Sequence, residues 1–249
     1  MIELLISDFF LQMCLIFLLA GLVKGTIGFG LPTVGIGLGA LISDIPTAMM
    51  LILVPTCLTN IVQIWANGSL KFVLGRSWAF LIGAVLLVPI GLWIVVALPQ
   101  FPFERLLGAS IFIYGAISLR GFNPAIADDY NHSIGFSFGL ANSVLTGLTG
   151  SFSVPGIMYL RALHFSDDDL LCAMGVLFLV STFAMGGSLW WLGRATQELS
   201  MSSLAMCGPV GIGVWAGTRV RGLLTETFFK KLFLYAFMTL GLYLIILGG

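Results

Sequence analysis

Long stretches of apolar residues without a single charge dominate the chain. Residues 77–103, 170–193, 199–218 and 232–249 contain no Asp, Glu, Lys or Arg. About 20 consecutive apolar residues cross the hydrocarbon core of a bilayer as a helix. The pattern therefore predicts an all-α fold, a polytopic transmembrane helical bundle.

Short polar segments and glycine clusters divide the chain into ten apolar elements, five in each half. We predict two transmembrane repeats, an N-terminal one at residues 1–122 and a C-terminal one at residues 133–249. The second element of each repeat is short for a span, which predicts broken or re-entrant helices. The elements are predicted at 4–24, 29–42, 46–66, 71–98 and 103–120, and at 133–146, 151–163, 169–192, 199–218 and 228–248.

The two halves share a faint ordered similarity. Gly25-Thr-Ile-Gly28 aligns with Gly147-Leu-Thr-Gly150, and Ala40-Leu41 meets Ala162-Leu163 at the same offset. After a slip of three residues, Ala48-Met49 meets Ala173-Met174. An internal repeat of this kind indicates that one supersecondary unit is used twice.

Basic residues predict the orientation, because cytoplasmic loops of membrane proteins are enriched in Lys and Arg. The 219–231 loop holds four basic residues and is expected inside, as is the loop near Lys71. The loops at Asp44, 99–102 and 193–199 then lie outside, together with both termini. Since five elements per half invert the second repeat, we expect the inverted topology of many secondary transporters.

Composition agrees with a membrane protein and excludes several functions. The chain is 59% hydrophobic and 9% charged, against about 45–50% and about 25% in soluble domains. Its formal net charge is zero, so nothing suggests nucleic acid as a partner. The four cysteines lie inside apolar stretches without metal or redox spacing. We therefore predict no cofactor and no metal site.

The densest motif is the glycine-rich segment 21–32. Gly28, Gly30 and Pro32 follow one another closely, and neither residue type suits a helix interior. Unwound backbone at membrane depth survives only inside protein or against a polar cavity. We expect a helix break here, with the N-terminus of the next helix suited to an anion. Close helix packing through the glycines is the alternative.

A second motif, Gly147 to Pro155, repeats this design with serines. Gly150 corresponds to Gly28, and the Ser151 and Ser153 hydroxyls are candidates to bind a ligand oxygen. Hydrogen bonds back to helix carbonyls are the alternative for these serines.

Lys24 is the only basic residue before Lys71, and it stands at the start of the first break. A buried ammonium is costly unless a partner compensates it. The neighbouring apolar stretches offer no acid, which favours a role as counter-charge for an anionic substrate. The alternative is a lysine that extends to the membrane interface.

Polar residues continue on one face of the following span, at Thr56, Asn60 and Gln63, and Ser181 lies in the corresponding span of the second half. Helix–helix hydrogen bonding and lining of a substrate pathway both explain them. The full set of predicted substrate-binding residues is Lys24, Gly25, Gly28, Gly30, Thr56, Asn60, Gln63, Gly147, Gly150, Ser151, Ser153 and Ser181.

These segments carry a resemblance to a known family. The runs GLVKGTIGFGLPTVGIGLGAL, PTCLTNIVQIW, GLTGSFSVPGIMYLRAL and GVLFLVST resemble the sulfite exporter TauE/SafE family. The resemblance implies a permease of the bacterial cytoplasmic (inner) membrane that exports sulfite, sulfoacetate or a related organosulfur anion. The second motif has Ser-Phe-Ser where many members carry glycines, which bears on the particular substrate.

The expected function is therefore a secondary transporter that exports a small anion, with sulfite or an organosulfonate as substrate and the lipid bilayer as surroundings. The alternative is an anion channel, or a permease for a small organic anion without sulfur. An enzyme is not expected, since no nucleophile–base pair or set of metal ligands falls at membrane depth. Homo-oligomerisation is left open.

Overall fold

The structure is a computed structural model that describes residues 8–121, 131–221 and 226–248. All regular secondary structure in these ranges is helical, which confirms the predicted all-α fold. The helices are α2 (Asp8–Ile27), α3 (Leu31–Gly39), α4 (Ile45–Ala66), α5 (Leu70–Leu86), α6 (Val88–Ala97), α7 (Phe103–Leu119), α8 (Asn131–Thr149), α9 (Gly156–Ala162), α10 (Asp167–Trp191), α11 (Gln197–Ala205), α12 (Cys207–Arg221) and α13 (Glu226–Leu247).

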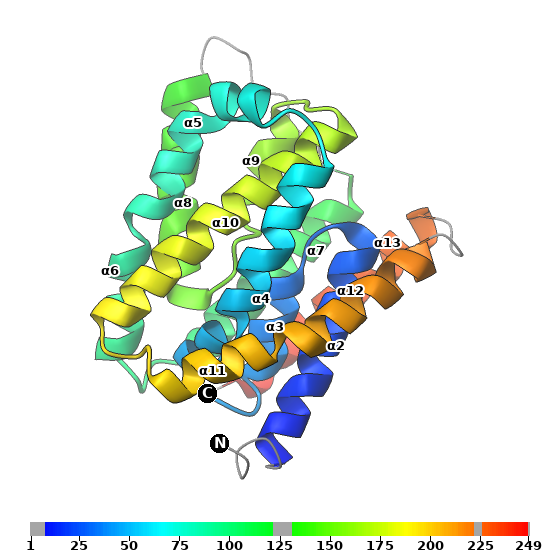
Figure 1. Cartoon of the computed structure of the whole chain (residues 1–249). Coiled ribbons are helices and arrows are strands. Elements are labelled where there is room, and N and C mark those ends of the chain that lie inside the picture. Colours follow the sequence, from blue (N-terminus) through cyan, green and yellow to red (C-terminus); the bar gives the residue numbers. More distant parts are fainter. Residues whose placement is uncertain (1–7, 122–130, 222–225, 249) are drawn as a thin grey trace.

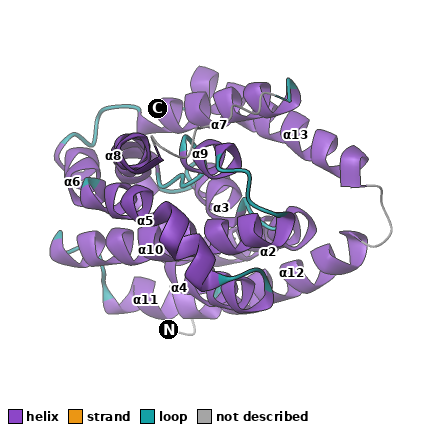
Figure 2. Ribbon diagram, turned by 90° about the horizontal axis from the view of Figure 1, so that it is seen from above, coloured by secondary structure: helices purple, strands orange, loops and turns teal. Residues whose placement is uncertain are grey.

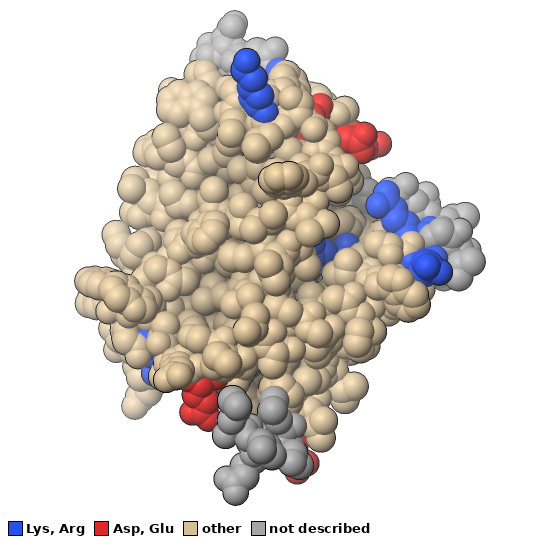
Figure 3. Space-filling model, in the orientation of Figure 1, with Lys and Arg blue, Asp and Glu red and all other residues tan. Residues whose placement is uncertain are grey.

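Five segments of the described chain are long and apolar enough to cross a membrane, as the hydrophobic pattern predicted. A shorter apolar helix at Lys231–Leu247 accompanies them. Charged side chains gather at the top, the upper right and the bottom of the molecule, and the surface between is almost free of them (Figure 3). This uncharged belt is what a bilayer requires. The five segments are Asp8–Ile27, Ile45–Ala66, Leu70–Ala97, Asp167–Trp191 and Gln197–Arg221.

Two predicted elements, 71–98 and 199–218, are each divided in two by the structure. The first breaks at Leu87, between α5 and α6, and the second at Met206, between α11 and α12. Pro89 and Pro209 explain both breaks, because proline cannot donate to the carbonyl four residues earlier and its ring clashes with it. The same deviation thus occurs in the same element of each half.

The helices pack in pairs that draw one member from each half. Helix α2 lies along α12, α8 lies along α5 and α6, α4 packs on α10, and α7 packs on α13 (Figure 1). The short helices α3 and α9 lie at the centre, surrounded by the longer ones (Figure 2). Exchanging the two halves element by element turns the α2–α12 pair into the α8–α6 pair and leaves the α4–α10 and α7–α13 pairs unchanged.

Glycines allow the paired helices to approach to backbone contact. A methyl group added at Gly21 would lie 2.5 Å from the Val210 carbonyl oxygen, and one at Gly213 would lie 2.8 Å from the Leu22 nitrogen. The corresponding pair uses Gly83 and Gly139 in the same way. Small residues replace the hydrophobic driving force that helices lack within a membrane.

We expect Gly213→Ala to lower the thermal stability of the protein. Its methyl group would meet the Leu18 carbonyl oxygen, and overpacking of this kind costs about 1–3 kcal/mol. The matched control is Gly208→Ala on the same helix, where an added methyl group has nothing within 4 Å. Thermal unfolding in lipid nanodiscs measures both variants, and equal losses would contradict the close α2–α12 contact.

Candidate functional site

A cavity of about 370 Å³ opens between α2, α4 and α12, with Leu171 of α10 at its side. Figure 3 shows the hollow at the centre of the view, with the blue of a basic side chain inside it. Lys24, Gly25 and Gly28 contribute its lining from α2 and the first break. Among the described residues that line this cavity, none is acidic.

Lys24 occupies the last turn of α2 and is only 5% exposed. Its ammonium nitrogen donates a hydrogen bond to the amide oxygen Oδ1 of Asn60 on α4. The helix ends directly after it because Gly28 adopts a positive φ of 84°, which L side chains rarely adopt. The amide oxygen is a neutral partner, so the positive charge of Lys24 is solvated but not neutralised by it.

Helix α4 brings its predicted polar residues to one buried face. Thr56 and Asn60 are completely buried, and Gln63 Nε2 donates to the Leu171 carbonyl oxygen of α10 at 2.8 Å. This hydrogen bond ties the wall of the cavity to α10. It also fixes the Gln63 side chain where it lines the cavity beside Lys24.

Pro55 lies inside α4 just before this polar face, and it cannot donate to the carbonyl oxygen of Leu51. Ser203 of α11 replaces the missing donor, since its hydroxyl donates to Leu51 O at 3.0 Å. The same hydroxyl accepts from the Val54 nitrogen at 3.1 Å. The helix therefore continues through Pro55, and Thr56, Asn60 and Gln63 stay on the same helix face.

The second break is held by an asparagine that the sequence analysis did not select. Asn142 of α8 is fully buried, and its Oδ1 accepts from the Gly156 nitrogen at 2.9 Å, at the first residue of α9. Its Nδ2 donates to Thr146 Oγ1 at 3.4 Å, and this hydroxyl donates to the Ser151 carbonyl oxygen at 3.3 Å. Backbone that leaves the helix is thus satisfied by side chains.

The structure brings the two breaks into direct contact. Thr33 Oγ1 of α3 and Ser153 Oγ lie 2.8 Å apart and are hydrogen-bonded, and both residues are buried. Gly150 has a positive φ of 70°, as its counterpart Gly28 does. The two motifs therefore meet at the centre of the bundle.

Several predicted site residues carry buried polar atoms without a partner in the described part of the chain. These atoms are Thr56 Oγ1, Asn60 Nδ2, Ser151 Oγ and Ser181 Oγ. A buried donor without a partner costs about 1–3 kcal/mol, and such atoms call for a ligand, a water molecule or a functional reason. Their residues belong to both halves, which indicates a polar centre built from the two repeats.

Not every predicted site residue reaches the cavity. Lys24, Gly25, Gly28 and Gln63 line it, and Asn60 joins it through its bond to Lys24. The remainder are absent from its lining: Gly30, Thr56, Gly147, Gly150, Ser151, Ser153 and Ser181.

Gly30 and Gly147 have packing surroundings instead. A methyl group at Gly30 would lie 3.2 Å from the Phe233 ring, so the N-terminus of α3 faces an aromatic cluster rather than the cavity. Gly147 contacts Gly91 of α6 closely, since a methyl group added at Gly147 would lie 2.7 Å from the Gly91 Cα. For these two positions the packing explanation accounts for the glycine.

Arg221 at the end of α12 also lines the cavity and was not selected from the sequence. In the sequence, the charge of Arg221 bears only on the predicted orientation of the basic 219–231 loop. Asn142 did leave a signal, since an amide four residues before Thr146 in an apolar span predicts a shared polar face. No group of three or more His, Cys, Asp or Glu residues suited to a metal ion occurs in the described ranges.

The chain matches the family model described as Sulfite exporter TauE/SafE over residues 13–244. The chain belongs to the TauE/SafE family. The match covers both helix breaks, the Lys24–Asn60 pair and most of each candidate span, so the resemblance stated from the motifs is confirmed. No curated protein and no solved structure matches the chain.

Membership in the TauE/SafE family makes this chain a multi-pass membrane protein of a family of sulfite and sulfur-anion exporters. Family members are permeases rather than enzymes. The polar centre described above is therefore the candidate transport site.

We expect the hydrogen bond between Thr33 and Ser153 to couple the two breaks energetically. In a double-mutant cycle, Thr33→Val and Ser153→Ala should show a coupling of about 0.5–1.5 kcal/mol in unfolding free energy. Ser151→Ala with Thr33→Val is the control, because Ser151 Oγ has no partner among the described residues. A coupling as large in the control pair would contradict the assignment.

Proposed function

We propose that this protein is a secondary transporter that exports a small anion, sulfite or an organosulfonate, across the bacterial cytoplasmic membrane. The observation that carries the proposal is the buried ammonium of Lys24 at the base of an accessible cavity, with a neutral amide as its partner. A charge at the centre of a membrane costs about 2.5–3.5 kcal/mol even on the more lenient scales. A bound anion relieves that cost, whereas a cation would add to it.

Export of an anion does not need to be coupled to proton movement. With the inside negative, each negative charge that leaves the cell gains about 2.3 kcal/mol per 100 mV of membrane potential. Arg221 lies at the rim of the cavity, at the end of α12, and belongs to the basic 219–231 segment that is expected inside. In the proposed orientation, the cavity therefore opens toward the cytoplasm, from which an exported anion must enter.

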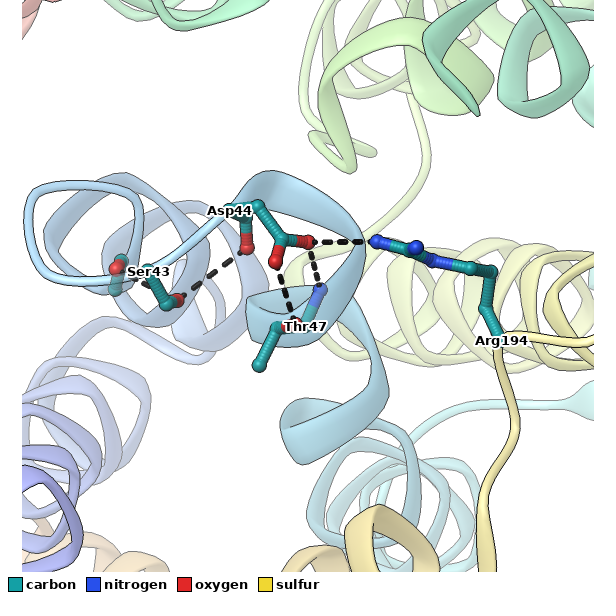
Figure 4. Close-up of polar contacts among 5 residues, drawn as sticks. Ser43, Asp44, Thr47 and Arg194 are labelled. Atoms are coloured by element: carbon teal, nitrogen blue, oxygen red, sulfur yellow. Dashed lines mark hydrogen bonds and ion pairs between the residues drawn. The ribbon is translucent and has the colours of Figure 1, made fainter. Parts of the chain in front are cut away.

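The pairing of helices supports an inverted repeat with alternating access. Helices α4 and α10 each start with an acidic residue, at the N-cap or in the first turn, that contacts the segment following the other helix. At the proposed inner end, Asp169 Oδ1 accepts from the Ser69 nitrogen at 2.8 Å. At the proposed outer end, Arg194 forms an ion pair with Asp44 at 3.3 Å, and Asp44 also accepts from the nitrogen and hydroxyl of Thr47 (Figure 4).

The proposed inner and outer ends of the bundle differ in how open they are. The outer hollow around Asp44 and Arg194 is only about 110 Å³ and contains none of the predicted site residues. The inner cavity of about 370 Å³ reaches Lys24. We infer an inward-facing state, in which the Asp44–Arg194 contact helps to keep the outer end closed.

Lys24→Met should abolish or greatly weaken anion transport. Loss of a charge-assisted hydrogen bond is worth about 1.5–3 kcal/mol, which lowers affinity about tenfold to a hundredfold. The melting temperature should change little, because removal of a buried charge offsets the hydrogen bond that Asn60 loses. Lys24→Arg should also be impaired, since the larger planar guanidinium does not fit a compact site.

Flux of sulfite and sulfoacetate into proteoliposomes measures these variants, with the exposed Lys71→Met as control. Full activity in Lys24→Met would end the proposal. Transport of taurine or a cation in preference to anions would also contradict it, as would single-channel currents in place of a saturable flux.

Arg194→Gln should open the outer end more often. An exposed ion pair contributes at most about 1 kcal/mol, so we expect a rise of about twofold to fivefold in the rate at which a membrane-impermeant maleimide labels Val95→Cys in intact cells. Val95 is buried and lines the outer hollow. The background lacks the four native cysteines, and Glu198→Gln at the same end is the control. Labelling only from the cytoplasmic side would refute the orientation.

A further inference from the structure

The inner cavity has a polar base and apolar walls. Lys24 and Gln63 lie at the base, and the walls are formed mainly by Leu58 and Val62 of α4 and by Val210 and Val214 of α12. Leu58 and Val62 are 49% and 67% exposed. Apolar surface of this extent next to a single buried charge fits a ligand with two chemically different ends.

The charged residues that line the cavity favour a ligand with one anionic head group. Among the described residues of the lining, Lys24 is the only buried cation, and Arg221 stands exposed at the rim. The charge of Arg221 is solvated and screened there, so it does not require a second anionic group to be compensated. A ligand with charges at both ends would have to place the second one against the apolar walls or against the neutral side chains of Thr59, Asn67 and Thr218, unless it extended to Arg221 at the rim.

The size of the cavity also exceeds the need of an inorganic oxyanion. A volume of about 370 Å³ falls in the range of about 300–1,000 Å³ that is typical of sites for organic ligands. Sulfite carries three oxygens on one sulfur and would contact the base alone, leaving the four wall residues uncovered.

We propose that the cavity binds organic anions with one charged head group and an apolar chain, in preference to inorganic sulfite or a dianion such as sulfoacetate. This inference rests on the proposed function, because it assumes that Lys24 binds the anionic head group. It goes further by stating which anions the same site prefers. The chain of the ligand lies along Leu58, Val62, Val210 and Val214, and its head group takes the donors that Lys24 does not give to Asn60.

Calorimetric binding to the protein in lipid nanodiscs tests this with sulfite, sulfoacetate, methanesulfonate, propanesulfonate and pentanesulfonate, with empty nanodiscs as blank. Each methylene that enters the cavity should raise the affinity about threefold to fourfold. Sulfite and sulfoacetate should bind more weakly than propanesulfonate. All binding should weaken at least tenfold in Lys24→Met.

A matched pair of variants locates the chain of the ligand. Val62→Ser should lower the affinity for pentanesulfonate about threefold to tenfold, because it removes apolar wall. Ile61→Ser changes the neighbouring residue of α4, which is exposed but does not line the cavity, and should leave the affinity unchanged. Equal effects of the two substitutions would overturn the assignment of the wall.

The remaining outcomes separate this inference from the proposed function. If sulfite, sulfoacetate and the alkanesulfonates bind equally well in a Lys24-dependent manner, the apolar-chain specificity is wrong and the anion exporter stands. If 1-pentanol binds as well as pentanesulfonate, the cavity is an apolar groove filled by lipid-like molecules and the inference fails. If no anion binds, the inference and the proposed function both fail.

Discussion

The architecture depends on one constraint: backbone polar groups inside a membrane must find partners within the protein. Continuous helices meet it by themselves, but this chain interrupts its helices near the centre in both halves. The break in the second half, and Pro55 inside the continuous helix α4, each leave a backbone group open, and a side chain from a neighbouring helix satisfies it. Asn142 satisfies the Gly156 nitrogen, and Ser203 satisfies the Leu51 carbonyl that Pro55 leaves open. Packing between neighbouring helices, within the second half and between the halves, therefore satisfies the backbone groups that the second break and Pro55 leave open.

The same packing creates the polar centre. Glycines such as Gly21 and Gly213 bring the backbones of α2 and α12 into contact, and Lys24, in the last turn of α2, is buried beside α4. Once the ammonium is enclosed, its bond to Asn60 orients it but cannot remove its charge. An anion is the ligand that this arrangement favours, and the membrane potential then favours its exit.

Much of this could be predicted from the sequence, and the limits have physical causes. Uncharged stretches and positive-φ glycines act locally, so the spans and the breaks at Gly28 and Gly150 follow from the residue order. Contacts between segments far apart do not. The polar face of Thr56, Asn60 and Gln63 was visible as a spacing of three and four residues, but only the folded chain shows that Asn60 is the partner of Lys24.

The role of the second motif shows the same limit. Ser153 was selected as a candidate ligand-binding hydroxyl, and the structure pairs it with Thr33, so that it joins the two breaks. Gly30 was expected at an anion-binding helix terminus and instead allows close approach of Phe233. Hydroxyl groups and glycines can serve either packing or ligand binding. Their neighbours in the folded structure distinguish the two roles, and the sequence alone does not show these neighbours.

The two halves correspond in how their helices pair but not in chemistry, and this difference bears on how transport would proceed. In the alignment of the two halves, Lys24 corresponds to Thr146, and Asn60 corresponds to Met185 after the three-residue slip. Of the two helix breaks, only the first therefore has a charged residue beside it. If the halves exchange conformations, as inverted repeats do, the outward-facing cavity would open along α10 toward Thr146. The anion would keep Lys24 as its counter-charge in both states while the walls around it change.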